Sequence, residues 1–265
     1  MYEGRQIVNL MLVAILISYA AIAAHAQLAP PSEFGNLVYP AKGNIQLDEG
    51  TLDLWVISQF DTDCPAHKTD ADQNWRALLF ELVLPDDKAK CIIHYISWAN
   101  CFAMVGYVNP PQPYVMFGPP QWKPGEEHHV VFAWSGPKRS VFIDGVCEWQ
   151  TPKTQGPINS CDVDVQGNLH GDLTSALIYV GGNYSHLAVD EIQIRNIALT
   201  REEIVKAKDA PLVADARTLL LDHCDGSAPE IIGGQTGETA GTLSGTHEII
   251  DGKFGKAIKL WRAKK

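Results

Sequence analysis

The chain has 265 residues and a formal net charge of −10, with 21 Lys and Arg against 31 Asp and Glu. Nucleic acids and anionic membranes bind surfaces rich in Lys and Arg, so this balance argues against both as partners. We expect partners that are neutral or cationic, with no nucleic acid among them. Gly (22) and Pro (16) are plentiful, as turn-rich all-β chains require.

The first 26 residues have the pattern of a secretory signal peptide. Arg5 precedes an apolar run over residues 7–24, and Ala24, His25 and Ala26 form the small-x-small pattern of a cleavage site. We expect a mature chain of residues 27–265 that is secreted, periplasmic or at the cell surface, without membrane contact after cleavage. The alternative is an uncleaved anchor, because the run is about long enough to span a bilayer.

An even number of cysteines, six, in an exported chain predicts disulfides. Cys91–Cys101 is the first expected pair, because the two residues flank a predicted hairpin turn. Cys147–Cys161 is the second, because it would close a Pro-containing loop. Cys64–Cys224 is then left by elimination. A metal interpretation is weaker, because the sequence contains no C-x-x-C pair.

Strand patterns dominate the chain, and only one helix is convincing. Strands are predicted at 51–56, 77–84, 91–97, 102–108, 114–117, 129–134, 140–143, 177–180 and 188–197. Asp144-Gly145 predicts a tight hairpin turn. Thr200 and Glu203 form a capping box at the start of a short helix near 200–208, which Pro211 stops. This pattern predicts an all-β, two-sheet antiparallel sandwich.

Four segments, in order, resemble strands of laminin-G-like (concanavalin A-like) jelly-roll domains of the bacterial type. They are residues 49–56, 125–134, 140–146 and 178–204, within a matched region of 33–208. The resemblance implies one jelly-roll domain over residues 27–265. Trp55 and Trp134 are expected in the core between the sheets, because they lie on the apolar phase of their strands.

The segment 217–261 resembles the strands with which that family opens, yet here it comes last. It could begin a truncated second domain, complete the same sandwich as a circular permutation, or complete a neighbouring molecule. We favour completion within the molecule, because the first and last strands of such sandwiches lie close together. An unpaired strand at Leu219-Leu220-Leu221 would also be an aggregation hazard.

No catalytic motif is present. The chain lacks the paired-carboxylate strand of related glycosidases, the G-x-S-x-G elbow, the P-loop and H-E-x-x-H. Strand alternation separates Asp190 from Glu191, and His128 from His129, onto opposite faces. We therefore predict that the protein is not an enzyme.

Calcium is the expected cofactor, if the protein has one. Asp190 begins the closing strand, and Asp225 follows the strand that should lie beside it, so the two carboxylates could hold a structural Ca²⁺. The alternative is that Asp190 caps a turn and Asp225 is a solvated loop residue.

Ligand binding is expected at tryptophans outside the strand cores: Trp122, Trp98, Trp75 and Trp149. Exposed indoles pack against the apolar C–H faces of sugars. Trp122, in the Pro-rich loop 109–125, is the first choice, because long loops at sandwich ends are common recognition surfaces. Its alternative is a buried hydrophobic lid.

These features predict a secreted recognition module, which binds a glycan or an extracellular protein at the loop ends of a β-sandwich. The second hypothesis is a structural subunit that self-assembles by exchange of its C-terminal strands. A glycosidase is disfavoured by the missing carboxylate pair.

Overall fold

The computed structural model describes residues 35–60, 76–85, 90–96, 101–107, 115–117, 121–150, 157–159, 161–164, 169–181, 186–226, 230–236 and 242–261. Residues 33–265 form one compact unit. Among the described residues, no helix is long and apolar enough to cross a membrane.

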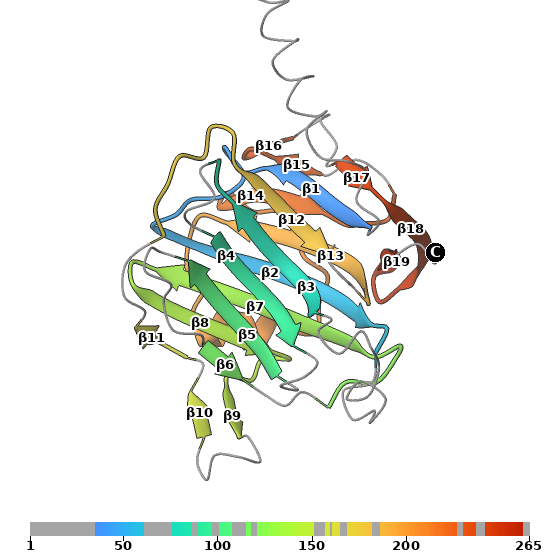
Figure 1. Ribbon diagram of the computed structural model, residues 1–265, viewed down its shortest axis with the longest axis horizontal. Helices are drawn as coiled ribbons and strands as arrows, with labels where there is room; N and C mark the ends of the chain where they lie inside the picture. Colours follow the sequence, from blue (N-terminus) through green and yellow to red (C-terminus); the bar gives the residue numbers. More distant parts are fainter. Residues whose placement is uncertain are drawn as a thin grey trace, which may run out of the picture. The chain divides into compact units, whose positions relative to one another are not determined.

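The described strands form two antiparallel sheets (Figure 1). The seven-stranded sheet has, in spatial order, β17 (Thr242–Ser244), β1 (Asn36–Pro40), β12 (Leu177–Gly181), β3 (Arg76–Val83), β4 (Lys90–Ile96), β5 (Cys101–Tyr107) and β6 (Val115–Phe117).

The larger sheet has, in spatial order, β11 (Val163–Asp164), β8 (Lys138–Ile143), β7 (Glu127–Ser135), β2 (Glu49–Ser58), β13 (Leu187–Arg195), β14 (Thr218–Asp222), β15 (Ile231–Ile232) and β16 (Gln235–Thr236). Two more of its strands, β18 (Thr246–Gly252) and β19 (Gly255–Trp261), form a hairpin beside β13. A separate two-stranded ribbon joins β9 (Glu148–Gln150) to β10 (Pro157–Asn159).

The main core lies between the two sheets. Leu52, Leu54 and Val56 of β2 are buried there together with Leu37 and Tyr39 of β1. Successive strand residues point to opposite faces, so one face of each strand enters this core. The all-β sandwich predicted from the sequence is confirmed.

Local signals for the helix and for one turn are also confirmed. The short helix α2 (Arg201–Ala207) begins with the Thr200–Glu203 capping box. Asp144 and Gly145 both have positive φ, and the backbones of Ile143 and Val146 hydrogen-bond to each other around them.

Trp134 lies in the main core as expected, but the prediction for Trp55 was wrong. Trp55 lies on the opposite phase from Leu54, so its ring is buried on the outer face of the larger sheet. There the ring packs against Leu212 and Leu221. Phe254, in the turn between β18 and β19, meets it edge-on with ring centroids 5.2 Å apart.

The C-terminal segment pairs with the rest of its own chain. Strand β14 pairs with the second half of β13, β19 pairs with the first half, and β17 pairs with β1 in the other sheet. In Figure 1 the orange and red tail strands lie at the edge of both sheets. The tail therefore completes the sandwich within one molecule.

Two glycines allow the C-terminal strands to pack closely against the rest of the sandwich. A Cβ atom at Gly35 would collide with the backbone oxygen of Thr246 on β18, and one at Gly181 would collide with the side chain of Leu260 on β19. Glycine at position 181 thus leaves room for Leu260, which is fully buried between the sheets. Gly181 also has φ +78°, a backbone conformation that glycine adopts readily.

A hydrogen bond between buried side chains joins the two sheets. The Tyr39 hydroxyl on β1 donates to Asp222 Oδ2 on β14 over 2.8 Å, and the Cys224 backbone N–H donates to Asp222 Oδ1 over 2.8 Å. Burial raises the pKa of Asp222 despite these two donors. The carboxylate is thus costly to bury, and each donor offsets part of that cost.

We expect Tyr39→Phe to lower the free energy of unfolding by about 1–3 kcal/mol, because it removes one donor from a buried carboxylate. Urea denaturation at neutral pH measures the change. The matched control is Tyr179→Phe, which removes a partly exposed hydroxyl and should cost less than about 0.5 kcal/mol. Equal losses in the two variants would contradict a specific role for the Tyr39–Asp222 bond.

Candidate functional site

The outward face of the seven-stranded sheet carries an aromatic ring, a carboxylate and several aliphatic side chains. The partly exposed residues there are Val38, Leu177, Tyr179, Glu81 and Val83. Their neighbours in sequence, among them Leu37, Ile178 and Leu82, are buried in the main core. Alternation therefore places this set on the side of the sheet that faces away from the core.

Strand register brings Tyr179 and Glu81 together. Tyr179 on β12 lies opposite Val38 on β1 and opposite Glu81 on β3. Residues directly opposite each other in an antiparallel pair have Cβ atoms about 4.5–5.5 Å apart. The ring therefore lies between an aliphatic side chain and a carboxylate.

The electrostatics of this face follow from that register. Partial burial raises the pKa of Tyr179, and the charge of Glu81 raises it further. The hydroxyl is therefore neutral across the physiological range and can both donate and accept hydrogen bonds. An aromatic face beside a strong acceptor is a chemical combination suited to a sugar.

The first-choice tryptophan of the sequence is not available for such a contact. Trp122 is only 3% exposed and packs against Phe60 and Phe102 in the main core. Its ring also stacks on His128, with centroids 4.0 Å apart and planes 1° apart. The expectation of an exposed Trp122 is corrected. The ring is buried because Phe60, Phe102 and His128 pack around it.

The other three tryptophans are less informative. Trp149 is on β9, in the ribbon. Trp75 and Trp98 lie outside the described residues.

The two adjacent histidines have different partners, as alternation predicts. His129 is fully buried, and its Nε2 lies 2.6 Å from Asp53 Oδ1. His128 Nδ1 lies 2.9 Å from Asp144 Oδ2, near the surface. The pair therefore does not converge on one metal ion.

The outer face of the larger sheet carries polar side chains that are buried under later segments of the chain. Asp53 accepts from Arg195 over 3.1 Å, and the Gln193 amide donates to the Val213 carbonyl oxygen over 2.9 Å. Ile204 of α2 closes the neighbouring part of this face with Phe142. The Gln193 hydrogen bond holds the segment after the helix in place, and the Ile204 contact holds the helix itself. Because these segments cover them, the polar side chains of this face have little access to a ligand.

The two calcium candidates occupy different environments. Asp190 is buried, and its Oδ2 accepts hydrogen bonds from the backbone N–H groups of Lys253 (2.7 Å) and Phe254 (3.0 Å). Burial raises its pKa, although these two donors oppose the shift. Asp190 thus caps the β18–β19 turn, and only Oδ1 is left for a cation. Asp225 is exposed, in the bend after β14.

The prediction that Asp190 and Glu191 point to opposite faces was wrong, because the pairing of β13 with β2 shifts at Asp190 and places Glu191 opposite Trp55, on the outer face where Asp190 also lies. Glu191 belongs to a separate chain of contacts. His223 Nδ1 lies 2.9 Å from its Oε1, and His223 Nε2 lies 3.1 Å from Glu230 Oε2. Burial lowers the pKa of His223, but the two carboxylates together raise it above its ordinary value. This arrangement ties β14 to β13 and does not resemble a pair of catalytic carboxylates facing a groove.

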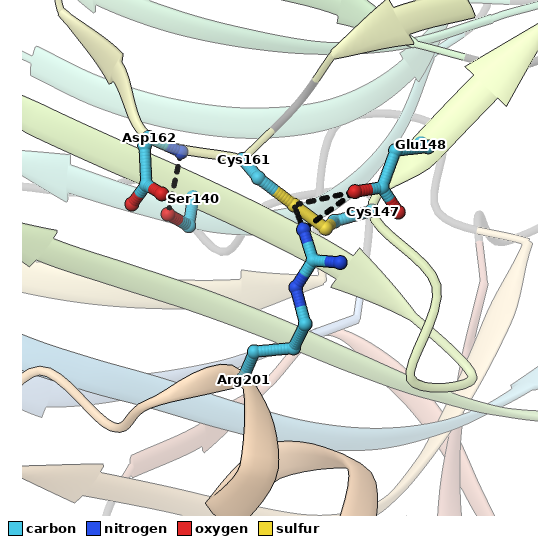
Figure 2. Close-up of a disulfide and its surroundings, with 6 residues drawn as sticks. All are labelled: Ser140, Cys147, Glu148, Cys161, Asp162 and Arg201. Carbon is cyan, nitrogen blue, oxygen red and sulfur yellow. Dashed lines mark hydrogen bonds and ion pairs between the residues drawn. A yellow bond between two sulfur atoms is a disulfide. The ribbon is translucent and has the colours of Figure 1, made fainter.

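A disulfide holds the base of the β9–β10 ribbon, as Figure 2 shows. Cys147 and Cys161 are bonded, with Cα atoms 5.6 Å apart, so this predicted pair is confirmed. Arg201, the first residue of α2, reaches Cys161 Sγ over 3.1 Å and pairs with Glu148 over 2.5 Å. The two sulfur atoms and Glu148 lie close enough to share a metal ion, but the disulfide and the Arg201 guanidinium disfavour one.

The other two predicted disulfides fare differently. Register pairs Cys101 with Ile96 and Cys91 with Gly106, five residues along the hairpin. That offset separates the two cysteines by about 17 Å along the strands, beyond the roughly 7 Å that a disulfide allows. The Cys91–Cys101 prediction was wrong. Cys224 is a buried free thiol, and Cys64 lies outside the described residues.

Sequence reasoning missed Tyr179 and Glu81. The available signal was that each lies between core residues on a predicted strand, so that its side chain points away from the core. Only the pairing of β12 with β3, which are far apart in the chain, places them side by side.

Comparison with known proteins found no matching family model and no matching curated protein. A Bacteroides ovatus protein with an inferred carbohydrate-binding function is similar in structure, at 11% identity and TM-score 0.47. This chain covers 56% of it with 86% of its own length. A serum-amyloid-P-like pentraxin from Limulus polyphemus matches at 12% identity and TM-score 0.42, over 69% of this chain and 78% of the pentraxin.

A Trypanosoma rangeli sialidase matches at 19% identity and TM-score 0.39, over 60% of this chain. The chain spans only 23% of the length of that sialidase. Each of these TM-scores is below 0.5, so the fold assignment rests on the strand pairing itself. That pairing defines a two-sheet antiparallel sandwich of the jelly-roll type.

We expect the double variant Cys147→Ser, Cys161→Ser to lose about 3 kcal/mol of unfolding free energy, because the bond closes a loop of fourteen residues in the unfolded chain. Urea denaturation measures this loss. Wild-type protein in excess dithiothreitol should lose the same amount, and the double variant should not respond to the reductant. An unchanged midpoint in the double variant would contradict a stabilising role for the bond.

Proposed function

We propose that the protein is a secreted, non-catalytic recognition module that binds glycans through the outward face of its seven-stranded sheet. The observation that carries this proposal is the partly exposed Tyr179 ring, flanked in register by Glu81 and by aliphatic side chains. Sugar rings have apolar C–H faces that pack on an aromatic ring, and hydroxyl groups that require acceptors.

The surroundings of Tyr179 support this assignment. Val38 and Leu177 extend the apolar area beyond the ring, and Thr242 on β17 continues the row of side chains at the sheet edge. Adjacent strands lie about 4.8 Å apart, so the row offers contacts at several points along a bound oligosaccharide. A site on rigid strands also holds its groups in fixed positions before the ligand arrives.

Export supports the same proposal. The amino-terminal 26 residues have the pattern of a signal peptide, and the Cys147–Cys161 bond suits an oxidising compartment. A glycan-binding module outside the cytoplasm meets polysaccharides of cell surfaces and matrices. Membership in the laminin-G-like family, suggested by the sequence segments, is part of this proposal.

We also propose a structural Ca²⁺ between Asp190 Oδ1 and Asp225. Among the described residues Asp190 Oδ1 is buried without a hydrogen-bond partner, which supports a further ligand there. Carboxylate oxygens are the ligands that Ca²⁺ prefers.

We expect Tyr179→Ala to weaken glycan binding at least about tenfold, a loss of about 1.4 kcal/mol, because it removes the central aromatic contact. A glycan array identifies the ligand, and calorimetry with that ligand measures the affinity of each variant. Tyr179→Phe should retain most of the affinity, because the ring remains. Wild-type affinity in Tyr179→Ala would rule out this face as the site.

For the calcium proposal, we expect Ca²⁺ to raise the melting temperature of the wild-type protein and to give binding heat by calorimetry, because a ligand that binds only the folded state stabilises it. Asp225→Asn should abolish both responses. Titration without heat and without a shift in melting temperature would contradict the proposal.

A further inference from the structure

We propose that two copies of this chain join through strand β18, which pairs edge to edge with itself in antiparallel fashion across a two-fold axis at Ile249. The strand, Thr246–Gly252, is the outer strand of the C-terminal hairpin. Such a contact needs an available strand edge and side chains whose order is complementary to itself, and β18 has both.

The edge of β18 is open to a partner strand. On one side β18 pairs with β19 over all seven of its residues, and on the other side no described strand pairs with it. The backbone N–H and C=O groups along the edge of a sheet are a template for another strand. A second copy of the same strand can pair with them when it runs antiparallel.

One side of β18 has an apolar side chain between a histidine and a carboxylate. Side chains alternate along a strand, so His247, Ile249 and Asp251 lie on the same side. All three are exposed, Ile249 by 43%. Among the described residues four large apolar side chains are exposed, and Ile249 is the one that lies on a strand. Pairing of two β18 strands would cover it.

The order of these three side chains is self-complementary. In an antiparallel pair centred on Ile249, the two Ile249 side chains face each other, and His247 of each copy faces Asp251 of the other. If the pair is centred one residue earlier or later, His247 or Asp251 faces Ile249 instead. The central apolar contact and the two flanking polar contacts therefore select one register.

His247 can reach the second copy through one ring nitrogen. Its Nδ1 atom donates to the carbonyl oxygen of Gly245 over 3.0 Å, and its Nε2 atom donates when the ring is protonated. The ionisable side chains near it on the hairpin lie on both strands: Glu248 and Asp251 on β18, and Lys256 and Lys259 on β19.

Asp251 can accept that hydrogen bond while it keeps its own partner. Its Oδ1 atom accepts from Lys256 Nζ over 2.5 Å, and its side chain is 91% exposed. A carboxylate has two oxygens with several acceptor positions. Oδ2 can therefore accept from His247 of the second copy.

The symmetry of the contact fixes how the two sandwiches face. Ile249 lies opposite Ile258 of β19, a residue of the main core, so the paired side chains are on the inner side of the larger sheet. A two-fold axis between antiparallel neighbours is perpendicular to the sheet, so both seven-stranded sheets lie on the same side of the joined sheet. Two Tyr179 faces would then act on one polysaccharide with increased avidity, a consequence that rests on the proposed glycan function.

We expect weak, reversible self-association, because one strand edge buries less than the roughly 1,200 Å² of stable complexes. Sedimentation equilibrium of the protein from about 1 µM to about 1 mM should show monomer and dimer, with a dissociation constant on the order of 100 µM. Larger species are not expected, because a two-fold contact closes. About pH 5.5 keeps histidine protonated, and about 0.15 M salt screens the repulsion between two acidic chains.

Variants of exposed side chains assign the association to β18. Ile249→Lys should raise the dissociation constant about tenfold or more, because two lysines would face each other. The matched control is Val213→Lys, which makes a similar change at a side chain that is 68% exposed outside β18, and it should leave the constant unchanged.

A charge exchange tests the register. His247→Asp should weaken association about tenfold, because carboxylates would then face each other. The double variant His247→Asp, Asp251→His should restore the dissociation constant to within about threefold, because the opposite charges face each other again.

Three results would overturn the proposed pairing: a monomer at every concentration, a dimer that Ile249→Lys leaves intact, or a double variant that recovers nothing of what His247→Asp loses. None of these measurements uses a glycan. Failure of the β18 contact therefore leaves the proposed glycan site standing, and a blank glycan array leaves the contact standing.

Discussion

Strand β13 lies in the middle of the larger sheet, and the rest of the structure depends on both of its edges being paired. One edge is covered by β2 along its length. The other is shared by two separate tail strands, β19 at the start of β13 and β14 at its end. An unpaired edge here would leave backbone N–H and C=O groups of a buried strand without partners, which costs several kcal/mol in total.

The change of partner along β13 explains the acidic residues at its centre. Asp190 lies at an irregularity in the pairing of β13 with β2, and its carboxylate caps the turn of the β18–β19 hairpin. Glu191 accepts a hydrogen bond from the backbone of Leu212, in the segment that crosses the outer face. Both carboxylates thus accept hydrogen bonds from backbone groups of later segments, the β18–β19 turn and the segment at Leu212. Their burial therefore has a structural cause.

The same architecture decides which surface is available for binding. The outer face of the larger sheet is covered by α2, by the segment around Leu212, and by the Phe254 turn. The seven-stranded sheet has partly exposed aliphatic and aromatic side chains on the corresponding face. The outer face of the larger sheet is therefore covered by later segments of the chain, whereas Tyr179 and Glu81 are partly exposed on the outer face of the seven-stranded sheet. The difference between the two faces locates the proposed site.

The sequence by itself determined the class of fold, the position of most strands, the capped helix, the Asp144-Gly145 turn and the Cys147–Cys161 bond. These features depend on local alternation, on turn chemistry and on short loops, which are readable along the chain. Only the tertiary structure decided which segments cover Trp55 on the outer face, the burial of Trp122 and the register that separates Cys91 from Cys101. It also decided the meeting of Tyr179 with Glu81. Each of these depends on which distant strands pair, and in what register, and a one-residue shift moves every side chain to the other face.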